Sequence, residues 1–194
     1  MDLQKINVKF FVAEPNGVPL TAFIDIFHAW IQATDGTYYD VADYSHMRAG
    51  PGIVLIAHEV NISIDEAGGQ RGLLYNRKQP LQGSNQEKLL RAFRDALEYC
   101  RKVEEEPALK GKIHFSGSEA LFLINDRLIA PNADESLRAV RPELEQLGRC
   151  LYGGADFSLA RDGDSRRRFS VLLKTPAPFS VERLLKNMEA ATDA

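Results

Sequence analysis

The sequence is poor in the features that mark several classes of protein, and cysteine is the first of them. Its 194 residues include only two cysteines, Cys100 and Cys150. Neither belongs to a Cys-x-x-Cys pair, and two thiols form no disulfide framework in a chain of this length. The sequence therefore excludes a small secreted fold that depends on disulfide bonds.

Long apolar runs are also missing. No segment approaches the roughly 20 apolar residues that a helix needs to cross a membrane. The apolar stretch near the N-terminus is too short for the core of a signal peptide, and Asp2 and Glu14 flank it. We therefore expect a cytoplasmic protein that is not associated with a membrane.

A surplus of positive charge is absent as well. The chain has 24 Lys and Arg against 27 Asp and Glu, which gives a formal net charge of −3. Proteins that bind duplex nucleic acid normally carry a basic excess to meet the phosphates. The one basic run, Arg166-Arg167-Arg168, lies close to Asp162 and Asp164, so nucleic acid is not expected as the main partner.

What remains is an ordinary globular composition, with 44% hydrophobic and 26% charged residues. The segment INVKFFVA is rich in β-branched and aromatic residues and predicts a strand that ends at the turn Pro15-Asn16-Gly17. Phe23, Phe27 and Trp30 then have the spacing of one buried helical face. A short extended piece, TYYDVADYSH, and a loop, MRAGPG, follow.

Residues 53–65, IVLIAHEVNISID, have a strand pattern throughout. The first five are apolar on both faces, and the pattern then alternates, with Val60 and its apolar neighbours on one side. The glycine-rich turn EAGGQRG and the returning segment GLLYNRK predict a β-hairpin. The polar side of the first arm carries Glu59, Asn61, Ser63 and Asp65.

The second half of the pattern begins with the clearest helix. Ser84 and Glu87 form a capping-box signature, and the apolar stripe behind them predicts a helix packed on a core. Two strands, KIHFSG and EALFLIND, are expected next, and then a helix over about 133–151 that contains Pro142. Two more strands and a short helix capped by Ser180 complete the chain. The apolar stripe consists of Leu89, Phe93, Ala96, Leu97, Cys100 and Val103.

The predicted order is βαββαβ, followed by the same order without its last strand. This is the order of a split βαβ or ferredoxin-like unit. We therefore expect an α+β protein made of two ferredoxin-like units in tandem, residues 1–116 and an incomplete unit of residues 117–194. Each would have an antiparallel sheet with helices on one face, and the two would share a core.

The densest group of polar residues beside glycines lies on and around the predicted hairpin. Oxygen-bearing side chains there would suit a small polar molecule, and the basic end of the returning strand could pair with Glu59 and Asp65. The alternative is that these side chains form the solvated end of a hairpin. The candidate ligand-binding residues are Asp43, His46, Glu59, Asn61, Asp65, Arg71 and Arg77.

Three functions are compatible with this pattern. The first is a binding or accessory protein that holds a small polar ligand or a partner protein in a cleft or on a sheet face between the halves. The second is a small enzyme with acid–base or metal-assisted chemistry at Asp43, His46 and Glu59. The third is a haem protein that uses one of its histidines as axial ligand, and the candidates are His28, His46, His58 and His114.

Several specific motifs are missing. His58-Glu59 begins like the zinc-protease motif His-Glu-x-x-His, but Ile62 occupies the place of the second histidine, and no other metal site is indicated. The glycine-rich segments match neither the phosphate-loop nor the dinucleotide pattern. His58 shares the apolar side of its strand, which favours a core residue over a ligand. The sequence therefore identifies no cofactor.

Overall fold

The computed structural model describes residues 1–13, 17–47 and 50–190. Most of the predicted turn at residues 15–17 and part of the MRAGPG loop lie outside these residues. The strands are β1 (Ile6–Val12), β2 (Tyr38–Tyr44), β3 (Gly52–Ala57), β4 (Val60–Asp65), β5 (Gly72–Arg77), β6 (Phe115–Ile124), β7 (Ser158–Arg161) and β8 (Ser170–Lys174). The helices are α1 (Ala22–Ala33), α2 (Asn85–Glu104), α3 (Asp134–Leu151) and α4 (Val181–Ala190), with 3-10 turns at Ala67–Gly69 and Pro107–Leu109.

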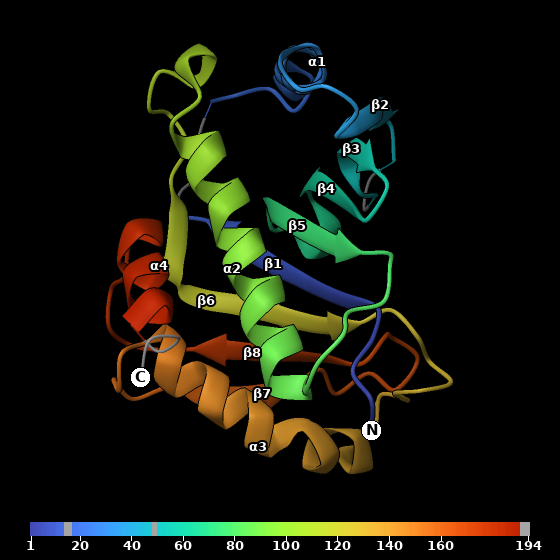
Figure 1. The fold of residues 1–194 in the computed structure, drawn as a ribbon, viewed down its shortest axis with the longest axis vertical. Coiled ribbons are helices and arrows are strands. Elements are labelled where there is room, and N and C mark those ends of the chain that lie inside the picture. Colours follow the sequence, from blue (N-terminus) through green and yellow to red (C-terminus); the bar gives the residue numbers. More distant parts are fainter. Residues whose placement is uncertain (14–16, 48–49, 191–194) are drawn as a thin grey trace.

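The fold is α+β, and the strands of the described residues form one antiparallel sheet in the order β2-β3-β4-β5-β1-β6-β8-β7 (Figure 1). β1 lies inside this sheet between β5 and β6 and is antiparallel to both. The sheet does not divide visibly into two units. The expected boundary between residues 116 and 117 falls inside β6.

Two strand predictions were wrong. Residues 53–65 form two antiparallel strands, β3 and β4, with Ile53 opposite Ile64 and a sharp turn at His58 and Glu59. This turn contains no glycine or proline; the main-chain oxygen of Glu59 instead accepts hydrogen bonds from the amides of residues 78 and 79, at 2.8 and 3.3 Å. The turn is therefore fixed by contacts with a distant segment, which a local pattern does not reveal.

The second error concerns β6, which the sequence predicts as two strands separated near Gly117. Gly117 lies inside one continuous strand, and a Cβ added to it would stand 2.3 Å from the main-chain oxygen of Phe179. Its amide donates to that same oxygen at 3.0 Å. The glycine thus permits a close approach of two backbones and does not mark a turn.

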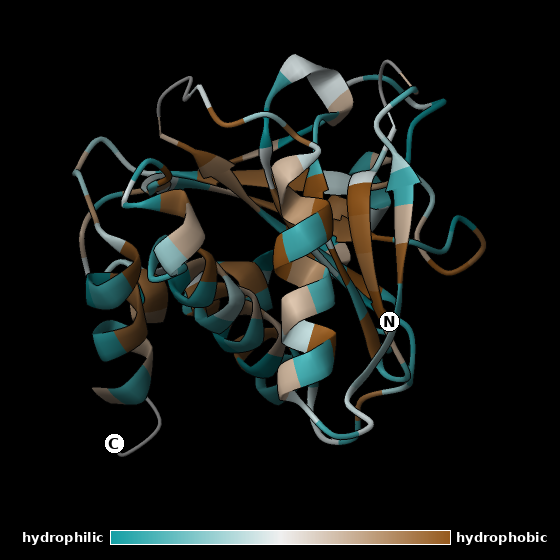
Figure 2. Ribbon diagram, turned by 90° about the horizontal axis from the view of Figure 1, so that it is seen from above, coloured by the Kyte–Doolittle hydropathy of each residue, from teal (hydrophilic) through white to brown (hydrophobic). Residues whose placement is uncertain are grey.

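The helices gather on one face of the sheet. α2 packs against β1 and β5 and also contacts α3 and α4, while α1 packs on β2 and β3. In Figure 2 the strands are largely hydrophobic, and the helices carry both hydrophilic and hydrophobic residues. No helix in the described ranges is long and apolar enough to span a membrane.

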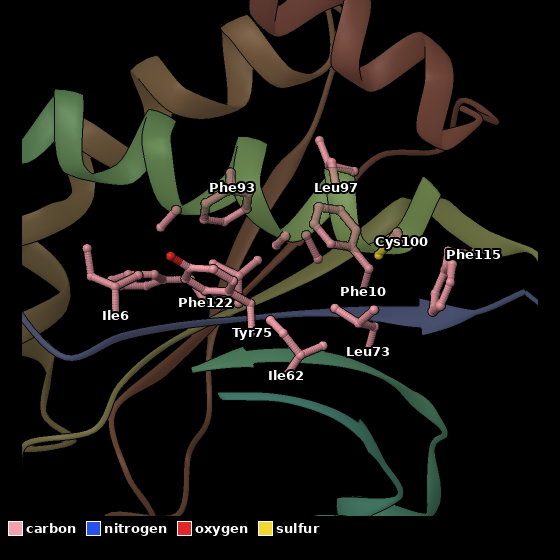
Figure 3. Packing of buried hydrophobic residues seen from close by; sticks show 14 of the residues in the cluster. Ile6, Phe10, Ile62, Leu73, Tyr75, Phe93, Leu97, Cys100, Phe115 and Phe122 are labelled. Atoms are coloured by element: carbon pink, nitrogen blue, oxygen red, sulfur yellow. The ribbon is translucent and has the colours of Figure 1, made fainter. Parts of the chain in front are cut away.

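The predicted stripe of α2 is confirmed as core. Leu89, Phe93, Leu97 and Cys100 are fully buried in one cluster with residues of both halves of the chain (Figure 3). The ring of Phe93 meets that of Phe10 edge to face, with centroids 6.2 Å apart. Burial raises the pKa of the Cys100 thiol, so this cysteine stays protonated and inert.

The helix ends follow the sequence signals. The capping box of Ser84 and Glu87 is present in both directions at the start of α2. The Ser180 hydroxyl accepts from the Arg183 amide at the start of α4, at 3.2 Å. α3 runs from Asp134 through Pro142 to Leu151, as the helix predicted over about 133–151.

Candidate functional site

The predicted pair of Glu59 and Arg77 is present at one end of the sheet. A nitrogen of the Arg77 guanidinium lies 2.6 Å from the Glu59 carboxylate. The Arg77 side chain is only 7% exposed, whereas that of Glu59 is 56% exposed. The hydrogen bond and charge of Arg77 lower the pKa of Glu59. The pair is therefore ionised, with one partner buried and the other facing solvent.

A set of aromatic hydroxyls lies beside this ion pair on the helix-covered face. The Tyr75 hydroxyl of β5 donates to the Asp95 carboxylate of α2 at 3.1 Å. The Tyr38 hydroxyl donates to that of Tyr99 at 3.3 Å. Burial raises the pKa of Tyr75, of Tyr99 and of Asp95. The two tyrosines therefore stay protonated at neutral pH and act as hydrogen-bond donors and acceptors, not as nucleophiles.

The ion pair, Tyr75, Asp95 and Tyr99 line a cleft with a volume of about 610 Å³, and Tyr38 lies behind Tyr99 outside the lining. Its walls are α2, the end of β5, the turn between β3 and β4, and the segment between α1 and β2. The charged side chains that line it are Glu59, Arg77, Arg91, Asp95 and Glu98, and the imidazole of His58 adds a further polar group. The cleft thus offers paired charges and neutral hydroxyls together, within the size range of small-molecule sites.

His58 does not lie in the core as predicted. It is an exposed residue of the β3–β4 turn, because the strand ends before it and the alternation of β4 starts only at Val60. His58 lines the cleft with its neighbour Glu59. The other three histidines, His28, His46 and His114, are also exposed.

Asp43 and His46 lie away from the cleft. Asp43 is opposite Ile53 on β3, whereas the cleft is at the other end of β2, where Tyr38 is opposite Ala57. Their partners Ile53 and Ala57 are four residues apart on β3, which corresponds to about 13 Å. Asp43 accepts a hydrogen bond from the Ser45 amide at 2.8 Å, and such bonds lower its pKa.

Asn61 and Asp65 are on the opposite face of the sheet, which no helix in the described residues covers. Asn61 lies there in a row with Asn76 and Asn7 on neighbouring strands. Asp65 forms a buried ion pair with Lys9 instead of pairing with an arginine of the returning strand. The predicted polar side of one strand is thus divided, with Glu59 at the cleft and the other three residues on the uncovered face.

The Lys9–Asp65 pair is buried on both sides, with side-chain exposures of 4% and 5%. The Lys9 ammonium also donates to the main-chain oxygens of Gln70 at 2.7 Å and of Ala67 at 3.3 Å. A Cβ at Gly72 would stand 2.8 Å from Cε of Lys9, so this glycine leaves the room that the lysine needs. All three ammonium protons have partners, which gives the pair a structural role.

Arg71 has a different partner from the one expected. Its guanidinium donates twice to the Glu66 carboxylate, at 2.8 and 2.6 Å, and once to the main-chain oxygen of Val18 at 2.6 Å. It therefore ties the β4–β5 turn to the segment before α1. Of the seven predicted residues, the structure brings only Glu59 and Arg77 together at the cleft.

The sequence reasoning missed the α2 side of the cleft. Arg91, Asp95 and Tyr99 are spaced at i, i+4 and i+8, which places them on one face of a helix. The sequence shows this spacing beside the apolar stripe. It does not show that this face of the helix lies opposite Tyr75 and Glu59 across the cleft. Within the described ranges, no group of three or more His, Cys, Asp or Glu residues is arranged to hold a metal ion.

Comparisons with protein-family models, with curated proteins and with solved structures found no match to this chain. The functional interpretation therefore depends on the geometry of the chain itself.

Proposed function

We propose that this protein binds a small polar ligand in the cleft between α2 and the β3–β4 turn. The observation that supports this most directly is the meeting of an ionised pair, Arg77–Glu59, with a partly buried tyrosine–carboxylate contact, Tyr75–Asp95, on one cavity. Buried carboxyls with shifted pKa values and convergent polar groups in a concave site are typical of binding sites.

The charges in the cleft suggest the chemistry of the ligand. Two guanidinium groups, of Arg77 and Arg91, meet three carboxyl groups, of Glu59, Asp95 and Glu98. A strongly anionic ligand would be repelled by the carboxylates, and a strongly cationic one by the guanidinium groups. A zwitterionic or uncharged, hydrogen-bonding molecule matches this mixture best.

The alternative of an enzyme that uses Asp43, His46 and Glu59 has less support. Asp43 and His46 are exposed at the far end of β2, and of the three only Glu59 lines the cleft. General acid–base catalysis needs its groups within hydrogen-bond reach of one reacting atom. The binding function uses the groups that line the cleft and needs neither Asp43 nor His46.

A thermal-shift screen tests the proposal. Wild type, Glu59→Gln and Asp95→Asn are screened against amino acids, polyols, nucleosides and metal ions. The matched control is Glu66→Gln, which removes a carboxylate from an arginine pair outside the cleft. We expect a compound that raises the melting temperature of wild type and control but not of the two cleft variants. An equal rise in all four proteins would place the binding site elsewhere and contradict the proposal.

We also propose that the chain is built from two ferredoxin-like halves that share a core. In such a unit the first strand lies between the last strand and the second arm of the hairpin. The sheet order supports this, because β1 lies between β6 and β5, and β6 lies between β1 and β8. Each half would then use the first strand of the other as its closing strand.

Fragments test this second proposal. Residues 1–116 and 117–194, expressed separately, are each expected to show no cooperative thermal melt, because the division cuts β6 and exposes sheet edges. A chain cleaved after Gly163, in the turn between β7 and β8, is the control and should still melt cooperatively. A soluble 117–194 fragment with a cooperative melt would contradict the shared core.

A further inference from the structure

The uncovered face of the sheet contains a second cavity, with a volume of about 580 Å³. Its floor crosses four strands in one row. Leu74 of β5 is opposite Lys9 of β1, which is opposite Leu121 of β6, and Leu121 is opposite Leu172 of β8. The three leucines are partly exposed, and no helix of the described chain covers them. We call this cavity the leucine groove.

The Lys9 side chain leaves this row toward Asp65 and the β4–β5 turn, and the Lys9–Asp65 pair occupies that end of the groove. The lysine charge is already matched by Asp65 and by the two main-chain oxygens that accept from it. This end therefore has no free cation for a ligand.

The other end is cationic. Arg127, Arg166, Arg167 and Arg168 line it, and the carboxylate of Asp162 is the only acid among the lining residues there. Arg166 and Arg167 pair with Asp164, and Arg167 also pairs with Asp162. This concentration of guanidinium groups contrasts with the net charge of −3 of the whole chain.

Two of these arginines have only uncharged acceptors. Arg127 donates to the main-chain oxygen of Arg166, and Arg168 donates to the side-chain oxygen of Asn125 at 3.0 Å. In the part of the chain that the structure describes, neither forms an ion pair. Their charge is therefore available to an anion from outside the chain.

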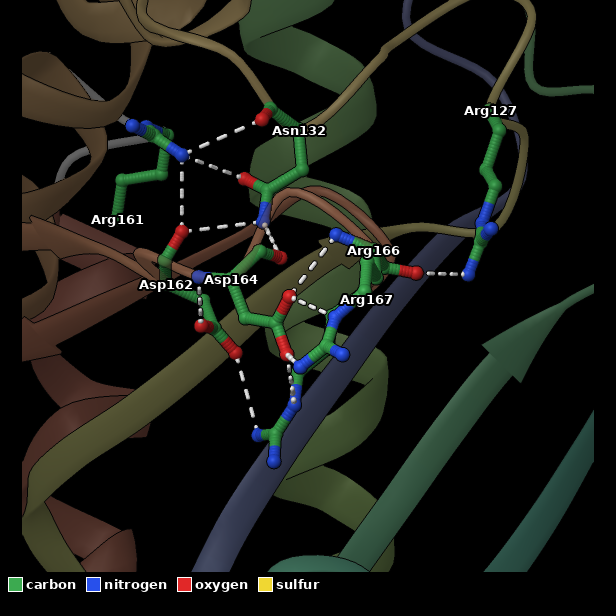
Figure 4. A network of polar contacts seen from close by, with 7 residues as sticks. All are labelled: Arg127, Asn132, Arg161, Asp162, Asp164, Arg166 and Arg167. Carbon is green, nitrogen blue, oxygen red and sulfur yellow. Dashed lines mark hydrogen bonds and ion pairs between the residues drawn. The ribbon is translucent and has the colours of Figure 1, made fainter.

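Hydrogen bonds within the protein hold the loops that carry these arginines in place without a ligand. Asn132 donates to the main-chain oxygens of Asp162 at 3.0 Å and of Asp164 at 2.8 Å, and Arg161 donates to Asn132 and Asp162 (Figure 4). The Arg127–Arg166 contact links this network to the loop after β6. A prepared cationic end lowers the ordering cost of binding an anion.

We propose that the leucine groove binds an amphipathic monoanion, an organic acid with an alkyl or aryl body. The body would lie on Leu74, Leu121 and Leu172, and the carboxylate would accept from Arg127 and Arg168. Arginine recognises carboxylates through charge-assisted and bidentate hydrogen bonds, and the volume suits a small molecule. Single-stranded nucleic acid fits less well, because leucines give bases no aromatic surface to stack on, and the aromatic lining residue Phe11 is only 8% exposed.

The site is independent of the proposed cleft, which lies on the other face of the sheet. Isothermal titration calorimetry with decanoate and with 1-decanol tests it, since the two probes share a chain length and differ in charge. We expect decanoate to bind wild type at least about tenfold more tightly than decanol, the difference that a charge-assisted hydrogen bond typically makes. Decanoate that does not bind, or that binds no more tightly than decanol, would overturn the proposal.

Separate variants test where the carboxylate and the alkyl body of decanoate bind. The double variant Arg127→Gln/Arg168→Gln should lose about tenfold in affinity for decanoate and keep its affinity for decanol. Leu121→Asn should weaken both probes. Arg138→Gln, a change of an exposed arginine on α3, is the control and should alter neither. Equal weakening of decanoate by Arg138→Gln and by the double variant, or displacement of decanoate by a single-stranded oligo-dT, would overturn the assignment.

Discussion

The two faces of the sheet hold their ion pairs in opposite ways. On the helix-covered face, Arg77 is buried while Glu59 is more than half exposed beside a cavity. On the face without helices, Lys9 and Asp65 are both almost completely buried. Helix coverage therefore does not decide which charges are buried. On the uncovered face the β4–β5 turn closes over the lysine and accepts two of its protons through main-chain oxygens.

This difference separates a structural pair from one that a ligand can use. Every proton of the Lys9 ammonium has an acceptor inside the protein, so a ligand would have to break an existing bond to use it. The Glu59 carboxylate keeps part of its surface in solvent and faces a cleft that also contains tyrosine hydroxyls. In both pairs the cation is buried, so the exposure of the carboxylate decides whether a ligand can contact the pair.

The largest expected effect is on stability, and it compares a core residue of the helix-covered face with a residue of the uncovered face. Phe93→Ala removes a fully buried ring that packs on Phe10, and should lower the free energy of unfolding by about 3–5 kcal/mol. Leu74→Ala, on the uncovered face, removes a partly exposed side chain and should cost no more than about 1 kcal/mol. Urea denaturation measures both. Equal costs would show that the uncovered face is as much a core as the covered one.

The next effect concerns the buried pair. Lys9→Met leaves the Asp65 carboxylate buried without its cation, which should destabilise the protein by on the order of 3 kcal/mol. The double change Lys9→Met/Asp65→Leu removes both charges and should recover most of that loss. The two proteins are compared by denaturation at one pH. If Lys9→Met alone kept wild-type stability, the structural role assigned to this pair would be wrong.

Part of this architecture was readable from the sequence because its signals are local. The start of α2 is set by Ser84 and Glu87, three residues apart, and its buried face by a stripe with helical spacing. Such signals depend on neighbours within one or two turns, so they persist whatever the rest of the chain does.

The features that escaped prediction depend on contacts between distant segments. The turn at His58 and Glu59 has no residue with a positive φ and is fixed by the amides of residues 78 and 79. Gly117 resembles a turn residue but serves an approach to Phe179. Pairing of Glu59 with Arg77 was predictable from a hairpin, whereas the convergence of Asp95 on Tyr75 required the placement of a helix on a sheet.

A smaller effect tests the cleft pair through its pH dependence. Arg77 lowers the pKa of Glu59 in the folded state, so the pair adds stability above the ordinary carboxyl pKa and loses it as the pH falls through the lowered value. Glu59→Gln should therefore cost no more than about 1 kcal/mol at pH 7, a figure that allows for solvent screening of the exposed carboxylate. The difference from wild type should vanish in acid. A cost that persisted unchanged at a pH below the lowered pKa of Glu59, where the carboxyl of wild type is protonated, would show that packing and not charge is responsible.

The smallest expected effect has the opposite sign and arises in the same cleft. Burial raises the pKa of Asp95 in the folded state. A raised carboxyl pKa gives stability that is fully present below the unfolded value and is lost as the pH rises through the folded one. Asp95→Asn keeps an acceptor for the Tyr75 hydroxyl and removes the partly buried charge, so it should raise the free energy of unfolding at pH 7 by no more than about 0.5 kcal/mol. Denaturation of Asp95→Asn and Glu59→Gln from pH 3 to pH 8 should give two curves that leave the wild-type curve in opposite directions as the pH increases. If Asp95→Asn were instead destabilising at neutral pH, the charge of Asp95 would stabilise the fold without any ligand. Its role would then be structural, like that of Asp65.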